Sequence, residues 1–310
     1  MPASPWLPPT AANCTNSGGA MPEKGPPVFL DYDQAALDAA YDQAAYAPNR
    51  EQLIERRIGA SASVRGRIGE PERIAYGMAV IERLDIYRAR HDAAPVFVFI
   101  HGGAWHSGRS KDFAGPAEMF LAAGAHYVVP DFAWVQDVGG SLMVLADQVR
   151  HAIAWVFQNI ARFGGDPNRL YLGGQSSGAH LAAVALTTDW RRDFGLPTDT
   201  IKGGVCISGM YELTPVRLSA RSRYVAFDNA TVAELSPIRH LERLQAPLVV
   251  ADRGRSHRLP HSGGRQGNRV GAQVDVGHRA PPAVKPIRSS VARPSRPYGL
   301  PRVSGNSKWL

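Results

Sequence analysis

Hydrophobic residues in this chain gather in short runs that predict buried β-strands. The clearest run is residues 96–100, an unbroken stretch of Val, Phe and Ile that is typical of a strand covered by helices on both faces. Shorter apolar runs of the same character occupy residues 127–129, 170–172, 205–207 and 248–251. We therefore expect these segments to form the centre of one sheet.

A longer segment between two of these runs has the pattern of a helix. Within residues 142–160, Leu145, Val149 and Ile153 recur at helical spacing and share one face. Strands that alternate with helices predict a mostly parallel sheet with helices on both faces. This arrangement defines the α/β class.

The N-terminal part predicts one helix and an antiparallel sheet edge. Apolar residues recur at helical spacing within residues 31–46, which predicts a helix that ends before Pro48. Short extended runs follow at residues 73–76 and 79–87, and they predict two paired strands at the antiparallel edge of the sheet.

One predicted strand leads directly into a serine flanked by glycines. Gly174-x-Ser176-x-Gly178 follows the apolar run 170–172 and precedes a helix of small residues. A bare pattern of this kind also occurs by chance as an ordinary turn. Here the strand–turn–helix context is that of a nucleophile elbow, because only small residues fit beside a serine on so sharp a turn. We expect the Ser176 hydroxyl to be exposed at the helix N-terminus, where N–H groups stabilise negative charge.

A glycine pair follows the central predicted strand. His101, Gly102 and Gly103 begin where the run 96–100 ends. Adjacent glycines let backbone N–H groups approach a developing negative charge with no side chain in the way. We expect the N–H groups of Gly102, Gly103 and Ser177 to form an oxyanion hole.

Aromatic residues and histidines near these loops suggest further roles. Trp105 and Trp134 are candidates for the wall of a substrate pocket, with plain core packing as the alternative for each. His101 and His106 lie five residues apart in a loop without a Cys or Glu cluster beside them, which is a poor match to a metal site. We expect His101 to orient the loop, and we expect no metal.

Together these motifs resemble those of the kynurenine formamidases, or arylformamidases, and related carboxylesterases. The resemblance covers about residues 27–251 and is carried by His-Gly-Gly-x-Trp at 101–105, Gly-x-Ser-Ser-Gly-x-His-Leu at 174–181, Phe-Gly-Gly-Asp-Pro at 163–167 and Leu-Asp-Ile-Tyr at 84–87. It implies an α/β-hydrolase that needs no cofactor. It also implies a serine hydrolase that cleaves N-formylkynurenine or small acyl esters through an acyl-enzyme on Ser176.

The resemblance further implies an acid and a histidine that follow the serine in the chain. The acid belongs in the loop after the run 248–251, where Asp252 stands. The base should follow some two to three dozen residues later and must reach Ser176. His257, His261 and His278 are the choices, and His278 has the best separation.

The sequence changes character after the run 248–251. Residues 252–310 contain no Glu or Phe, and Gly, Pro, Ser and Arg interrupt every candidate helix. We expect a basic tail of low order and a sheet that is incomplete at the C-terminus. A shifted reading frame in a GC-rich gene would produce such a change. The coding DNA near codon 251 tests this hypothesis, and an intact long frame that encodes only this tail would refute it.

Length and composition favour one catalytic domain between two tails. The chain has 310 residues, of which 44% are hydrophobic and 20% charged, as is ordinary for a globular protein. Residues 1–20 are rich in Pro, Ala, Ser and Gly and predict a disordered extension, so residues 21–251 are the expected hydrolase domain. Met21 is an alternative translation start. With two cysteines, no signal peptide and no apolar run of roughly 18 to 20 residues, a cytoplasmic location is expected.

The net charge of +8 is concentrated at one end of the chain. Residues 251–310 hold 12 of the 35 basic residues but only 2 of the 27 acidic ones. One competing function is therefore binding of nucleic acid or an acidic surface, although a tail with only Tyr298 and Trp309 as aromatics offers no stacking platform. Another is a hydrolase fold with impaired catalysis, because a triad without its histidine loses most of its activity. We expect a small-molecule ester or formamide as partner, no membrane and no nucleic acid, with a homo-oligomer left open.

Overall fold

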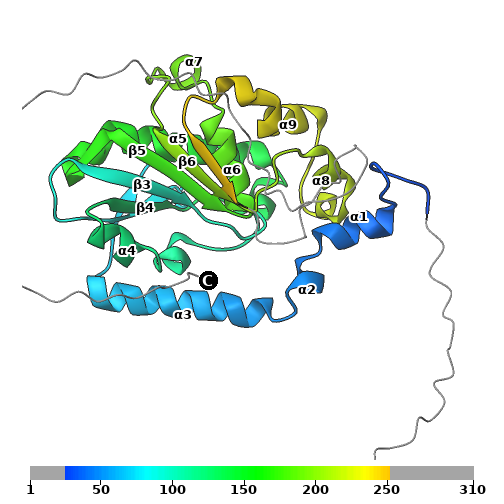
Figure 1. The fold of residues 1–310 in the computed structure, drawn as a ribbon, viewed down its shortest axis with the longest axis horizontal. Coiled ribbons are helices and arrows are strands. Elements are labelled where there is room, and N and C mark those ends of the chain that lie inside the picture. Colours follow the sequence, from blue (N-terminus) through cyan, green and yellow to red (C-terminus); the bar gives the residue numbers. More distant parts are fainter. Residues whose placement is uncertain (1–24, 252–310) are drawn as a thin grey trace, which may run out of the picture. The chain divides into compact units, whose positions relative to one another are not determined.

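A seven-stranded sheet organises residues 25–251, the part of the chain that the computed structural model describes (Figure 1). The strand order is β1-β2-β4-β3-β5-β6-β7, in which β3 to β7 run parallel and β2 is antiparallel to both of its neighbours, β1 and β4. The strands are β1 Glu72–Ala75, β2 Arg83–Tyr87, β3 Ala94–Ile100, β4 His126–Pro130, β5 Gly165–Gln175, β6 Gly203–Ile207 and β7 Leu248–Ala251. The predicted α/β fold with an antiparallel edge is confirmed.

Helices lie on both faces of this sheet (Figure 1). On one face, α5 (Leu142–Asn159) and α6 (Ser177–Leu186) bury their apolar residues in the larger core cluster. On the other face, α3 (Arg50–Ile68) and α4 (Ala117–Ala122) contribute to a smaller cluster. The helix predicted at residues 142–160 is therefore confirmed as α5.

The central strand β3 is covered on both sides, as its unbroken apolar sequence predicts. Val96 and Val98 are at most 1% exposed and belong to the larger cluster beneath α5 and α6. Phe97 points to the opposite face and stacks on Phe120 of α4, with ring centroids 4.5 Å apart. Burial of both faces explains why no polar residue interrupts this strand.

The N-terminal helices differ from the sequence-based prediction. The single helix expected at residues 31–46 is two helices, α1 (Gln34–Tyr41) and α2 (Gln43–Tyr46). Asp42 breaks them apart because its side chain accepts a hydrogen bond from the Ala44 N–H at 2.8 Å and caps the second helix.

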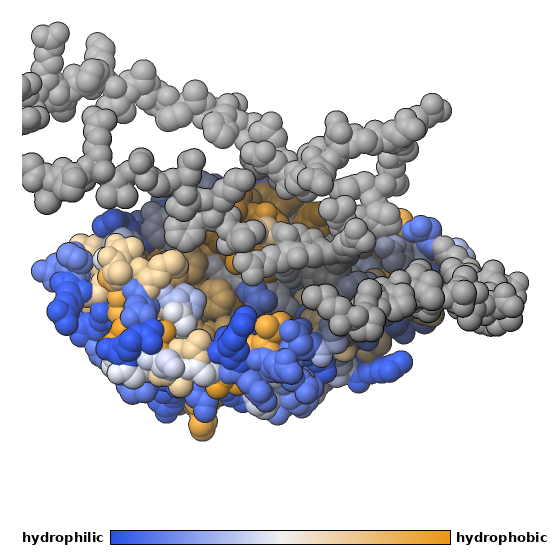
Figure 2. Space-filling model, turned by 60° about the horizontal axis from the view of Figure 1, so that its bottom comes forward, coloured by the Kyte–Doolittle hydropathy of each residue, from blue (hydrophilic) through white to orange (hydrophobic). Residues whose placement is uncertain are grey.

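The sequence pattern did not predict the 19-residue helix α3, which lies between Pro48 and the first predicted strand. Only Ser61 and Val64 of this helix are buried, so it has no broad apolar face for the sequence to reveal. Ile54 and Ile58 are each 41% exposed. Figure 2, turned to bring this side forward, shows hydrophilic and hydrophobic residues interspersed on the surface.

The strand predicted at residues 79–87 is shorter than expected. Residues 79–82 form a turn in which the Glu82 side chain accepts a hydrogen bond from the Ala79 N–H at 2.8 Å, and β2 begins only at Arg83. The remaining helical segments are short. They are α7 Trp190–Phe194, α8 Thr214–Leu218 and α9 Asn229–Glu234, with 3-10 turns η1 Ser110–Phe113, η2 Val135–Val138, η3 Ile160–Phe163, η4 Ala220–Arg223 and η5 Pro237–Arg243.

Both predicted tails lie outside the described residues. They are the extension at residues 1–20 and the basic segment 252–310. Within the described part, β7 is the outer strand of the sheet, with Val249 60% and Val250 42% exposed. No helix in this part combines the length and apolar composition that a membrane span requires.

Candidate active site

The two glycine motifs meet at the carboxyl ends of two neighbouring strands. β3 pairs with β5 in parallel, and Ile100 at the end of β3 lies opposite Gly174 near the end of β5. The loop after β3 and the turn after β5 therefore leave the sheet at the same side, at the carboxyl ends of the parallel strands. In open α/β sheets ligands bind at these ends.

Ser176 occupies a strained turn between β5 and α6. Its backbone has φ 57° and ψ −126°, a conformation that costs free energy for any residue with a Cβ. Two hydrogen bonds hold it, one from the Ser176 N–H to the Ile207 carbonyl at 2.8 Å and one from the His180 N–H to the Ser176 carbonyl at 3.2 Å. Ser176 is partly exposed, so its hydroxyl stands at the end of a rigid turn and within reach of solvent.

The flanking glycines are required because α6 crosses the strands at close range. A Cβ on Gly174 would lie 2.4 Å from the Gly178 carbonyl oxygen. A Cβ on Gly178 would lie 2.1 Å from the Ile100 carbonyl oxygen and 2.4 Å from that of His101. Real Cβ atoms do not approach backbone so closely, so the Gly-x-Ser-x-Gly spacing is a packing requirement of the turn.

The loop after β3 lies directly against this turn. A Cβ on Gly102 would be 2.7 Å from the Gln175 carbonyl oxygen and 3.3 Å from Ser176 Cβ. Gly103 has φ +132°, and a Cβ there would collide with the Ser107 carbonyl oxygen at 1.9 Å. Among residues 25–251, no acceptor bonds the N–H groups of Gly102, Gly103 or Ser177. Three donors, in the serine turn and in the loop packed against it, are therefore left unpaired within this part of the chain.

Trp105 is buried beneath the loop. It is 1% exposed, and its ring meets that of His180 edge-on at a centroid distance of 5.4 Å. The backbone N–H of Trp105 donates to the Ser177 hydroxyl at 3.2 Å, and its backbone carbonyl accepts from the Val135 N–H at 2.8 Å. These contacts connect the loop after β3 to the start of α6.

Trp134 lies further along the same edge and is half-buried. Its indole N–H donates to the Gly108 carbonyl at 3.0 Å, and the Arg109 guanidinium stacks 3.6 Å above the ring centroid. Neither Trp134 nor Trp105 is among the residues that line the cavity described below.

His101 is fixed at the base of the loop. Its ring stacks between Phe132 and Phe113 at centroid distances of 4.4 and 5.1 Å, and its Nδ1 donates to the Gly102 carbonyl at 2.9 Å. Burial lowers the pKa of His101, which keeps the ring neutral. His106, by contrast, is exposed, and its ring meets Tyr224 edge-on.

His180 is a buried histidine to which the sequence analysis gave no role. Its Nε2 donates to the Leu235 carbonyl at 2.8 Å, which links α6 to the segment after α9. Burial lowers its pKa to about 4, so the imidazole is neutral near pH 7. The only sequence signal for this residue is its place in the Gly-x-Ser-Ser-Gly-x-His-Leu motif at residues 174–181.

An ionic network with two buried carboxylates holds the segment that follows the glycine pair, and sequence reasoning missed it. Arg73 of β1 donates to Asp85 of β2 and to Asp131 after β4, both at 2.6 Å. The Ser110 hydroxyl donates to Asp85 at 2.6 Å, and the Ser110 N–H donates to Asp131 at 2.6 Å. Both carboxylates are almost fully buried and paired, so the network ties the sheet edge to the segment that follows the glycine pair.

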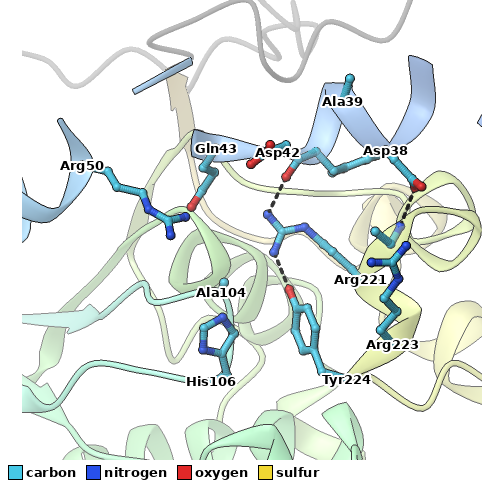
Figure 3. Close-up of a pocket in the computed structure, with 12 residues that line it drawn as sticks. Asp38, Ala39, Asp42, Gln43, Arg50, Ala104, His106, Arg221, Arg223 and Tyr224 are labelled. Atoms are coloured by element: carbon cyan, nitrogen blue, oxygen red, sulfur yellow. Dashed lines mark hydrogen bonds between the residues drawn. The ribbon is translucent and has the colours of Figure 1, made fainter. Parts of the chain in front are cut away.

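A cavity of about 430 Å³ opens beside the glycine loop (Figure 3). Ala104 and His106 come from the loop, and the other walls come from α1, α2, the start of α3 and η4. The lining residues are Asp38, Ala39, Tyr41, Asp42, Gln43, Arg50, Ala104, His106, Ala220, Arg221, Arg223 and Tyr224. Burial raises the pKa of Tyr41 to about 12, so its phenol stays protonated.

The structure thus brings together Ser176, Ser177, Gly102 and Gly103. Asp252 and the histidines His257, His261 and His278 lie outside the described residues. Within residues 25–251 no group of three or more Cys, His, Asp or Glu side chains is arranged to hold a metal ion.

A mostly parallel sheet with a serine on a strained strand–helix turn and a glycine loop against it defines an α/β-hydrolase of the esterase class. Comparison with known proteins agrees. Residues 84–203 match the BD-FAE family model. The kynurenine formamidase of Danio rerio is 31% identical over 225 residues, which cover 70% of this chain and 74% of that protein. The chain therefore belongs to the kynurenine formamidase family, and it is an esterase- or arylformamidase-like hydrolase.

Other relatives match over shorter stretches. The kynurenine formamidase of Salmo salar is 35% identical over 147 residues, which are 46% of this chain and 47% of that protein. Esterase LipC of Mycobacterium tuberculosis is 31% identical over 55% of this chain and 44% of its own length. A solved protein from Silicibacter sp. tm1040 superposes with a TM-score of 0.59 over 70% of this chain and 79% of its own, at 21% identity, which supports the fold.

Proposed function

We propose that the chain cleaves small acyl esters or aryl formamides of the N-formylkynurenine type through an acyl-enzyme on Ser176. The observation that carries this proposal is the position of Ser176. It stands at φ 57° on a rigid turn, next to a loop in which the N–H groups of Gly102 and Gly103 have no partner among the described residues. Membership of the kynurenine formamidase family supports the substrate class.

The proposed chemistry begins with attack of the Ser176 hydroxyl on the substrate carbonyl. The N–H groups of Gly102, Gly103 and Ser177 would stabilise the oxyanion that forms, each donor contributing roughly 10²–10³ in rate. A histidine takes the serine proton and returns it to the departing amine or alcohol. Water then hydrolyses the acyl-enzyme and releases formate or a short carboxylic acid.

The base is assigned to the C-terminal segment because two central histidines of the body have structural bonds. His101 and His180 are both buried, and each donates a ring N–H to a carbonyl. We therefore keep His278 as the proposed base, with His257 and His261 as alternatives, and Asp252 as the acid that orients it. If none of the three histidines reaches Ser176, the chain is a hydrolase fold with impaired turnover.

A fluorophosphonate probe tests the proposal directly, because it reports an activated serine without needing the substrate. The wild-type chain should be labelled, and Ser176→Ala should not. Formate release from N-formylkynurenine and hydrolysis of 4-nitrophenyl acetate should be lost in the same variant. Labelling that persists in Ser176→Ala would contradict the proposal.

The histidine variants identify the base. His278→Ala should lower turnover by several orders of magnitude if His278 is a member of a coupled triad. The same loss in His257→Ala or His261→Ala instead would move the assignment to that residue. Full activity in all three variants would place the base among residues 25–251.

A further inference from the structure

Arg221 in η4 is a buried cation without an anionic partner among the described residues. Its side chain lines the cavity beside the glycine loop, and the residue is only 6% exposed. One guanidinium nitrogen donates to the Tyr224 hydroxyl at 2.7 Å and another to the Tyr41 carbonyl at 3.4 Å. Its Nε is buried and bonds no acceptor in this part of the chain. A guanidinium has five N–H donors, so most of its hydrogen-bonding capacity is unused here.

Neutral groups around Arg221 do not replace a counter-ion. The ring centroids of Trp105 and Tyr41 lie 5.7 and 5.9 Å from the guanidinium carbon, near the outer limit of a cation–π contact. Burial of a charge is costly unless the charge is paired. The paired arginine network at Arg73 shows how the same chain satisfies a guanidinium for structural purposes, with two carboxylates at 2.6 Å. Arg221 has no such arrangement within residues 25–251.

Two more arginines line the same cavity. Arg50 and Arg223 are exposed, and neither makes an ion pair with a described residue. Figure 3 shows Arg221 between them, below the junction of α1 and α2. The lining also holds two carboxylates, each of which accepts a backbone N–H: Asp38 from Ala220 at 2.6 Å and Asp42 from Ala44 at 2.8 Å. Neither forms an ion pair with a described residue, and with three arginines against two aspartates the lining has a net positive charge.

The cavity adjoins the glycine loop that is proposed to hold the substrate carbonyl. Ala104 forms part of its lining and follows Gly103 directly in the chain. A volume of about 430 Å³ is within the range of small-ligand sites. A substrate whose carbonyl contacts the glycine loop would extend its leaving group past Ala104 towards Arg221.

We propose that this cavity binds a carboxylate on the leaving group of the substrate, with Arg221 as the specificity-determining residue. The proposal rests on the proposed hydrolase function and narrows it to acyl or formyl compounds that carry an anionic end. Arg221 is suited to the task because a planar guanidinium pairs with a carboxylate through two parallel hydrogen bonds. Arg50 and Arg223 add to the positive potential that attracts the anion.

The test compares two substrates that differ only in this charge, N-formylkynurenine and its carboxamide. The wild-type chain should have a higher kcat/KM for the carboxylate. Arg221→Gln should reduce the ratio of the two kcat/KM values on the order of 100-fold, chiefly through KM, because it removes one member of a buried charge pair. Arg221→Lys should retain part of the preference. Arg192→Gln is the matched control, since Arg192 is 62% exposed on α7 and paired with Asp193, and its ratio should equal that of the wild type.

A second set of measurements keeps the test decisive if Arg221→Gln does not fold. Arg50→Gln and Arg223→Gln alter exposed residues, and each should lower the ratio several-fold. Kynurenine should slow fluorophosphonate labelling of the wild type more than its carboxamide does. Equal kcat/KM values for both substrates in the wild type, or an unchanged ratio in the arginine variants, would overturn the proposal. These outcomes are distinct from failure of the hydrolase function, in which the wild type would not be labelled at all.

Discussion

The backbone N–H of Trp105 donates a hydrogen bond to the hydroxyl of Ser177, at 3.2 Å and across 72 residues of sequence. This contact joins the loop after β3 to the first residue of α6. The N–H of Ser177 and those of Gly102 and Gly103 are the proposed oxyanion donors, so the bond fixes the two halves of that site relative to each other. Precise placement of donors is what makes such a site effective.

Ser177→Ala should therefore loosen the site without removing a donor. The substitution leaves the buried Trp105 N–H without an acceptor, which should cost about 1–3 kcal/mol in the free energy of unfolding. We expect kcat to fall several-fold, with little change in KM. Ser63→Ala on α3 is the control, because its hydroxyl donates only to the Gly59 carbonyl on the exposed surface. Equal effects of the two variants on kcat would show that the bond has no catalytic consequence.

Gly102→Ala tests the contact between the loop and the turn. The new Cβ would lie 2.7 Å from the Gln175 carbonyl oxygen and 3.3 Å from Ser176 Cβ, so the loop must move away from the serine. We expect a loss of roughly 10²-fold in kcat, as for removal of one oxyanion donor. Labelling of Ser176 by the fluorophosphonate should slow in parallel. If Gly102→Ala has the turnover and labelling rates of the wild type, Gly102 is not part of the oxyanion hole.

Gly178→Ala should lower the stability of the folded protein, whereas Gly102→Ala is expected to act on catalysis. Its Cβ would meet the backbone oxygens of Ile100 and His101 at 2.1 and 2.4 Å, and backbone cannot yield as a side chain does. We expect a loss of at least about 3 kcal/mol in the free energy of unfolding. Gly59→Ala in α3 meets nothing within 4 Å and should instead stabilise the protein by about 0.5–1 kcal/mol. Urea unfolding of both variants measures the difference.

The sequence was sufficient for features that depend on local pattern. The apolar run that became β3 and the helical periodicity of α5 both predicted their elements closely. The serine turn was also predictable, because its glycines answer a steric need that arises within a few residues of Ser176.

Features that depend on distant partners were not predictable. α3 was missed because it buries only Ser61 and Val64, and a helix without a broad apolar face has no clear periodic signal. The partners of Arg73 lie 12 and 58 residues away, and two of the groups around Arg221, Tyr41 and Trp105, come from α1 and from the loop after β3. No local pattern reveals the two buried carboxylates that pair with Arg73 or the burial of Arg221.

The last prediction concerns the stability of the fold at acid pH, through His180. Its pKa falls from 6.5 in the unfolded chain to about 4 in the buried site. The unfolded chain therefore binds more protons than the folded one between these values, so stability is lost as the pH falls from about 6.5 to about 4. The full difference corresponds to about 3 kcal/mol, of which about 2 kcal/mol should be gone at pH 5.

The variant His180→Gln isolates this contribution, because glutamine does not titrate and its amide can donate to the Leu235 carbonyl as the imidazole does. Urea unfolding at about pH 7.5 and pH 5 should show a larger loss for the wild type than for the variant. His101 and His126 also have lowered pKa values, but they contribute equally in both proteins and cancel in the comparison. Equal losses in the two proteins would mean that His180 is protonated as readily in the folded state as in the unfolded one.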